Sequence, residues 1–147
     1  MVVTNFYGGT VNADVDGNTV TGNGPVNYIA QNGIQVSNGA TATVTNNIVS
    51  AYDYTPATFA AVGILVFGSG TTTVTGNNIT NAMEGIYVQS ADAPLVSGNT
   101  IATSSDTGIV IFSQSAGPYS TNNVSGSTYG IYAGDVSNLS LDASVLT

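Results

Sequence analysis

The chain of 147 residues has no Lys, Arg, His, Cys or Trp, and its eight acidic residues give a formal charge of −8. With no basic group to neutralise phosphate, nucleic-acid binding is all but excluded and anionic membrane surfaces are disfavoured, while the lack of cysteine rules out disulfides and thiolate metal sites. The longest apolar run, residues 59–67, is far too short for membrane insertion.

Asn, Ser and Thr make up about a third of the chain, and they favour strands and tight turns over helix. Along the chain, Val15 and Val20 supply a first pair of apolar positions, and a Gly-Ile pair with an alternating apolar strand then opens each of five further copies. The pairs start at Gly33, Gly63, Gly85, Gly108 and Gly130, at intervals of 30, 22, 23 and 22 residues. They predict a repeat of about 22 residues.

Each copy also contains two later apolar positions, which predict two more short strands. The second positions are Val44, Val74, Val96, Tyr119 and Leu141. The third positions are Ile48, Ile79, Ile101, Val124 and Val145. Two residues before the third position, one asparagine recurs in five consecutive copies: Asn18, Asn46, Asn77, Asn99 and Asn122.

Three strands in each copy indicate a coil in which every strand pairs in parallel with its equivalent in the next coil, about 4.8 Å away. Equivalent side chains then stack, and the asparagines form a ladder of amide hydrogen bonds at one bend. The pattern G-I-x-V…V-x-G-N-x-I resembles the repeat of right-handed parallel β-helix proteins of the pectate-lyase-like superfamily. We therefore expect an all-β solenoid of about six coils; a β-sandwich is the alternative.

One domain, residues 1–147, is expected, with loop insertions at about 21–32 and 49–62 on the same corner of neighbouring coils. These insertions gather aromatic rings beside a carboxylate, a combination with which proteins bind sugars. The candidate ligand-binding residues are Tyr28, Tyr52, Asp53, Tyr54 and Phe59. The alternative is that the loops pack their rings onto the solenoid.

The outward positions of the first strand in each copy are apolar and form a stripe that a soluble monomer rarely leaves exposed. The candidate assembly face consists of Leu65, Phe67, Tyr87, Val110, Phe112 and Tyr132. Either the insertion loops or another chain should cover it.

The resemblance implies polysaccharide chemistry that uses carboxylates, calcium and a basic residue. Since the chain lacks basic residues, catalysis of this kind is not expected, although acid–base work by carboxylates alone stays an alternative. Asp14 and Asp16 are considered as calcium ligands together with Asn18; the alternative is a solvated turn, and we expect no cofactor.

The first functional hypothesis is a non-catalytic structural solenoid, extracellular or on the cell surface. Polar caps are missing from both ends of the sequence, and open strand edges predict head-to-tail self-association into a fibre; a module cut from a longer solenoid is the alternative. The second hypothesis is a module that binds or processes glycans through the insertion loops. Ice binding by the threonines of residues 41–45 and 71–75 is a third.

Overall fold

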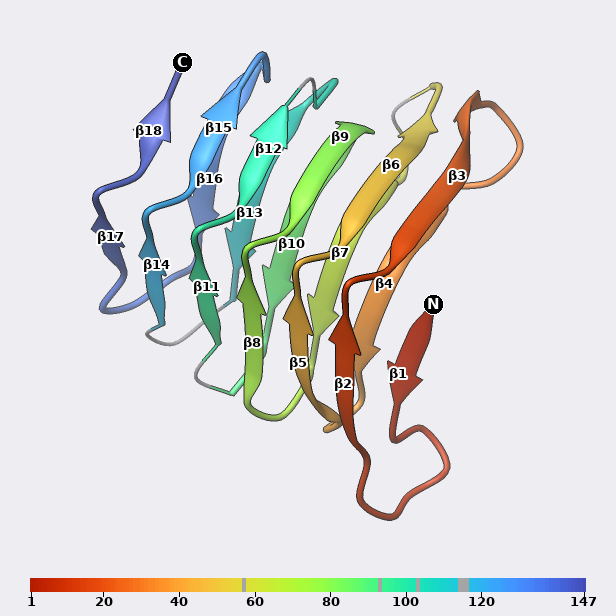
Figure 1. Ribbon diagram of the computed structural model, residues 1–147, viewed down its shortest axis with the longest axis vertical. Helices are drawn as coiled ribbons and strands as arrows, with labels where there is room; N and C mark the ends of the chain where they lie inside the picture. The colour runs from red at the N-terminus through yellow and green to blue at the C-terminus, as the bar shows by residue number, and fades with distance from the viewer. Residues whose placement is uncertain (57, 93, 103, 114–116) are drawn as a thin grey trace.

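The computed structural model describes residues 1–56, 58–92, 94–102, 104–113 and 117–147. The chain forms three parallel sheets of six strands each, and every coil contributes one strand to each sheet (Figure 1). The described residues contain no helix. The all-β solenoid of about six coils predicted from the sequence is therefore confirmed.

The three sheets run side by side along the solenoid axis. The first sheet contains β1 (Val2–Thr4), β4 (Asn32–Ser37), β7 (Val62–Phe67), β10 (Glu84–Gln89), β13 (Thr107–Phe112) and β16 (Tyr129–Gly134). The second sheet contains β2 (Asn12–Asp16), β5 (Thr41–Thr45), β8 (Thr72–Thr75), β11 (Leu95–Ser97), β14 (Pro118–Ser120) and β17 (Ser140–Asp142). The third sheet contains β3 (Thr19–Val26), β6 (Ile48–Tyr54), β9 (Asn78–Ala82), β12 (Thr100–Ala102), β15 (Asn123–Ser125) and β18 (Val145–Leu146).

The parallel register places equivalent side chains in columns that fill the interior. In the first sheet, Val66 pairs with Val88, and Val88 pairs with Ile111. All three side chains have 0% of their surface exposed. Burying an aliphatic side chain fully stabilises the fold by about 1.5–3 kcal/mol, so these columns are the main source of stability.

The asparagine ladder lies inside the bend between the second and third sheets. Asn47 Nδ2 donates to Asn77 Oδ1 at 2.9 Å, Asn77 Nδ2 donates to Asn99 Oδ1 at 3.0 Å, and Asn99 Nδ2 donates to Asn122 Oδ1 at 3.0 Å. Each amide also donates to an interior carbonyl, as Asn77 does to Val44 O at 2.9 Å. The ladder satisfies backbone groups that would otherwise be buried without partners.

One member of the predicted ladder was wrong: Asn47, and not Asn46, occupies the column. Asn46 turns the chain with a φ of 54°, and its amide donates outward to Asp16 Oδ1 at 2.9 Å. The predicted third position moves with it, since Val49 is fully buried while Ile48 is 51% exposed. Because Asn-Asn is followed by Ile-Val here, this copy of the repeat can be aligned with the others in two ways that differ by one residue.

The last coil needs the same correction of one residue. Leu146, and not Val145, pairs with Val124 in the third sheet. Asn18, at the other end of the ladder, occupies the predicted place, because its Nδ2 donates to Asn47 Oδ1 at 3.0 Å.

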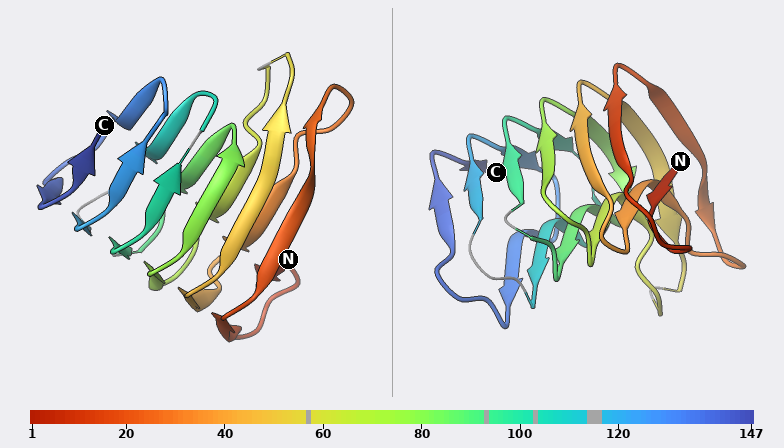
Figure 2. Two further views of the ribbon diagram at one scale, coloured as in Figure 1. Left: turned by 45° about the horizontal axis from the view of Figure 1, so that its top comes forward. Right: turned by 90° about the horizontal axis from the view of Figure 1, so that it is seen from below.

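The two predicted insertions are partly strand. Residues 21–26 and 49–54 extend β3 and β6, which pair from Gly24 with Tyr52 through Val26 with Tyr54. The two segments touch, as expected from their shared corner. The loop that follows β3 projects beyond the edge of the solenoid at which β6 also ends (Figure 2). Ala57, within the second predicted insertion, lies outside the described residues.

Candidate functional site

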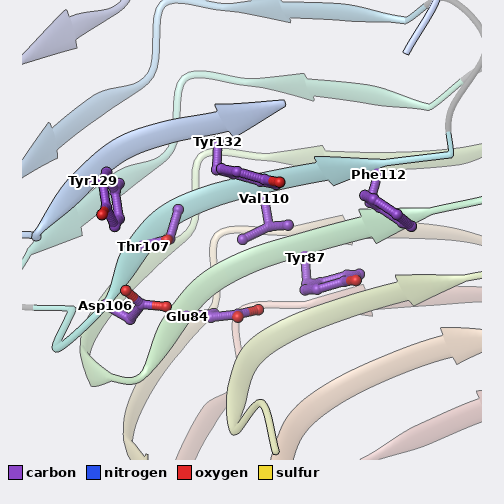
Figure 3. A pocket seen from close by; sticks show the side chains of 8 residues that line it. All are labelled: Glu84, Tyr87, Asp106, Thr107, Val110, Phe112, Tyr129 and Tyr132. Atoms are coloured by element: carbon purple, nitrogen blue, oxygen red, sulfur yellow. The ribbon is translucent and has the colours of Figure 1, made fainter. Parts of the chain in front are cut away.

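A hollow of about 480 Å³ opens on the outer face of the first sheet, over β10, β13 and β16 (Figure 3). We call it the aromatic groove. Its lining consists of Glu84, Tyr87, Asp106, Thr107, Val110, Phe112, Tyr129 and Tyr132. A volume of this size suits a small ligand or one segment of a larger one.

The groove exists because a short side chain stands between two long ones. Tyr87 pairs with Val110, and Val110 pairs with Tyr132, so the three form one outward column. Figure 3 shows both tyrosine rings almost edge-on, with Val110 between them. Their backbones are two strand spacings apart, about 10 Å, which leaves a slot about as wide as one flat six-membered ring.

A second aromatic column extends the wall of the groove along the strands. Phe112 pairs with Gly134, and a Cβ at Gly134 would lie only 3.1 Å from Phe112 Cδ2. The phenylalanine ring therefore occupies the space that the glycine leaves free. Beside it, Tyr87 donates its hydroxyl to Gln89 Oε1 at 3.2 Å, which holds that ring along the strand.

Two carboxyl groups lie at the other end of the groove, beside Thr107 (Figure 3). Glu84 is only 8% exposed, and its Oε2 atom has no hydrogen-bond partner among the described residues. Burial, with a smaller contribution from the negative charge of Asp106, raises the pKa of Glu84 to about 7. Glu84 can therefore hydrogen-bond a ligand as a donor when protonated or as an acceptor when ionised.

Backbone position explains why these polar residues meet. Glu84 pairs with Thr107, and Thr107 pairs with Tyr129, so they form a column at the start of the first-sheet strands. Asp106 immediately precedes this column, and its N–H donates to Met83 O at 3.0 Å, which fixes the turn into β13.

The structure brings together four of the six residues predicted for the assembly face: Tyr87, Val110, Phe112 and Tyr132 line the groove. Leu65 and Phe67 belong to the same columns one coil earlier, outside its lining. Sequence reasoning missed four lining residues: Glu84, Asp106, Thr107 and Tyr129. The sequence pattern could have indicated three of them, because Glu84, Thr107 and Tyr129 each directly precede a glycine of the Gly-Ile repeat.

The predicted sugar site in the insertions loses one of its members. Tyr52 is 7% exposed and belongs to the core, where its ring packs against Gly33, so it cannot stack on a ligand. Tyr54 and Phe59 contact each other, with ring centroids 6.5 Å apart. Asp53 Oδ1 accepts a hydrogen bond from Ser105 Oγ at 2.9 Å, which ties the second coil to the fourth. Tyr28, at 72%, is the most exposed of the set.

The acidic residues considered for calcium take part in hydrogen bonds within the fold. Asp16 Oδ1 accepts from Thr45 Oγ1 at 2.7 Å and from Asn46 Nδ2, and these bonds lower the pKa of Asp16. The side chain of Asn18 is held in the ladder. Asp14 lies on the outer face of β2. In the part of the chain that the structure describes, no cluster of three or more metal-ligating acidic, histidine or cysteine side chains occurs.

Comparison with known proteins shows which family has this architecture. A family model described as a right handed beta helix region matches residues 3–146. The chain belongs to the right-handed β-helix family. For this β-helix, searches of curated proteins and of solved structures found no match. Among the described residues of the β-helix, no helix has the length and apolar character needed to span a membrane.

Proposed function

We propose that this right-handed β-helix is an extracellular carbohydrate-binding module and that the aromatic groove holds the sugar. The observation that carries the proposal is the slot between Tyr87 and Tyr132, floored by Val110 and closed at one end by carboxyl groups. Aromatic faces cover the apolar faces of a pyranose, while carboxyl and hydroxyl groups bind its hydroxyls. A location outside the cell agrees with the lack of Lys and Arg, which leaves trypsin-like proteases no cleavage site.

The slot runs along the strands of the first sheet and its lining comes from three neighbouring coils, so a sugar held in it contacts several coils at once. Tyr87, Val110 and Tyr132 come from β10, β13 and β16, one coil apart in each step. The insertion segments are a less suitable site because Tyr52, their central ring, is in the core.

Removing a ring of the slot should weaken glycan binding. We expect Tyr87→Ala and Tyr132→Ala each to raise the Kd for a bound oligosaccharide about tenfold or more, since each deletes one stacking face. The measurement is a glycan array followed by calorimetry on the strongest ligand. Tyr7→Ala is the matched control, because Tyr7 is 97% exposed in the loop after β1 and far from the groove in sequence.

The variant Tyr28→Ala distinguishes sugar binding in the aromatic groove from sugar binding in the insertion segments. Loss of binding in Tyr28→Ala with full binding in Tyr87→Ala would move the site to the insertions. Failure of the wild-type protein to bind any glycan would overturn the proposal.

As a second function, we propose end-to-end association of copies of this β-helix. The strands β1 to β3 and β16 to β18 each have a neighbouring strand on one side only within the described residues. The ladder has complementary ends. Ser144 takes the ladder position in the last coil, where its Oγ accepts from Asn122 N at 3.4 Å, and Asn18 Oδ1 accepts no hydrogen bond from the described residues. The backbone N–H of Ser144 in one copy can thus continue the ladder onto Asn18 of the next.

Sedimentation velocity over a range of protein concentrations tests the association. We expect oligomers that grow with concentration, and Leu146→Asp should shift them to monomers by placing a charge on the open end of the third sheet. Ile48→Asp is the control, because Ile48 is equally exposed, at 51%, but lies on the flank of a middle coil. A monomer at every concentration would refute this proposal.

A further inference from the structure

We infer that the sugar in the aromatic groove carries a protonated amine, so that the preferred ligand is an amino-sugar oligosaccharide. This inference rests on the proposed carbohydrate function and names its ligand class. It starts from the charge of the lining: Glu84 and Asp106 are the ionisable carboxyl groups of the groove, and the chain has no Lys, Arg or His to balance them. An acidic glycan would meet repulsion there and nothing to pair with.

The buried carboxyl group supplies the specific contact. Glu84 is more than nine-tenths buried, and its Oε2 atom is without a hydrogen-bond partner among the described residues. An unpartnered buried oxygen costs free energy until a donor reaches it. A ligand ammonium group has three N–H donors, which suffice for Glu84 and the neighbouring Asp106 together. A neutral hydroxyl group can make one such bond and leaves the second carboxyl group unpaired.

The aromatic walls favour the same charge. The face of a tyrosine ring attracts a cation within about 6 Å of its centre, and the attraction grows when water is excluded. Tyr87 and Tyr132 present ring faces to the slot, and Tyr129 lies beside Thr107, on the side away from Glu84 (Figure 3). An amine on the pyranose ring thus has carboxyl groups on one side and rings on the other, while the rest of the sugar occupies the slot above Val110.

Proton release gives the inference a second signature. The groups that face Glu84 are Asp106 and Tyr87, and neither can neutralise it. Because the pKa of Glu84 is about 7 in the free protein, most molecules carry a proton there at pH 6. An ammonium group favours the ionised form, so binding should expel that proton. A neutral glycan would not expel it.

Calorimetry with three oligomers of equal length tests the inference at pH 6 and about 0.15 M salt, where long-range attraction is screened. The oligomers are β-1,4-linked glucosamine, its N-acetylated form, which lacks the charge, and oligogalacturonate. We expect glucosamine to bind about tenfold more tightly than the acetylated oligomer and oligogalacturonate not to bind. The heat of binding of the glucosamine oligomer should vary with the ionisation enthalpy of the buffer, because the released proton is taken up by the buffer.

Glu84→Gln keeps the shape of the side chain and should abolish both the preference for glucosamine and the buffer dependence. Asp142→Asn, at an exposed position on β17, removes one charge outside the groove and should change neither. Equal binding of the acetylated oligomer would overturn the inference and leave the carbohydrate function standing. No binding by any of the three oligomers would also overturn the inference, and the glycan array then decides whether the carbohydrate function stands. Equal weakening by Glu84→Gln and Asp142→Asn would show non-specific charge attraction and would also refute it.

Discussion

Replacing Asn77 by alanine should lower the free energy of unfolding by about 4 kcal/mol or more, because three or more buried polar groups lose a partner at once. Asn77 Oδ1 accepts from both the backbone N–H and the side-chain amide of Asn47, each at 2.9 Å. Its own amide donates to Val44 O and Asn99 Oδ1. Alanine keeps the turn but orphans the Asn47 N–H and the Val44 carbonyl, and water cannot easily reach them because Asn77 is 1% exposed.

The neighbouring residue offers a matched control for this experiment. Asn78 lies in the same Asn-Asn pair, but its side chain is exposed on β9. Its backbone N–H donates to Asn47 O at 2.8 Å, and alanine retains that bond. We expect Asn78→Ala to change stability by less than about 0.5 kcal/mol. Denaturant unfolding of both variants measures the difference, and equal stability of the two would show that the ladder contributes nothing particular.

Gly85→Ala should destabilise the protein by about 3 kcal/mol or more, and it should also disturb the aromatic groove. A Cβ at Gly85 would lie 2.5 Å from Gly108 O and 2.6 Å from Ile101 Cγ2. The first contact involves a backbone carbonyl of the next coil, which cannot move without breaking the first sheet. Since Gly85 follows Glu84 directly, any shift displaces the buried carboxyl group as well.

The reason for this close approach is a column of glycines at the start of the first-sheet strands. A Cβ at Gly33, Gly63 or Gly108 would likewise come within 2.6–2.7 Å of the carbonyl oxygen of the next glycine in the column. The second to fifth coils therefore leave no space for a side chain at this corner. The recurring Gly-Ile pair is a packing requirement of the solenoid.

Gly130→Ala is the matched control within the column. There, the nearest atoms to a Cβ are those of the Leu146 side chain, at 3.2–3.4 Å, and that side chain is half exposed and can move. We expect a loss of about 1 kcal/mol or less. Thermal unfolding of both variants, with circular dichroism to confirm the β signal, makes the comparison. If Gly130→Ala proved as damaging as Gly85→Ala, contact with the neighbouring carbonyl would not be the cause.

The fold depends on local, repeated features that can be recognised in the sequence alone. A Gly-Ile pair every 22 or 23 residues across most of the chain places Ile86 and Ile109 in one column, as pairing in the first sheet bears out. Period-two alternation then determines which side chains point inward. Errors in strand register arose only where two adjacent residues were chemically alike, as in Asn46-Asn47, because an alignment of copies cannot choose between them.

The place where a ligand could bind depends on contacts between coils, which local sequence patterns do not specify. Tyr52 and Tyr54 are both tyrosines of one segment, yet the ring of Tyr52 is buried in the core, because it packs into the space left by Gly33 on β4 of the first sheet. The groove likewise depends on Val110 lying between Tyr87 and Tyr132, which are 23 and 22 residues away along the chain. A concavity is a relation between side chains of different coils, and its depth follows from their stacking at the strand spacing. The burial of Glu84 beside Asp106 is set by the same stacking, and with it the proton affinity of the groove.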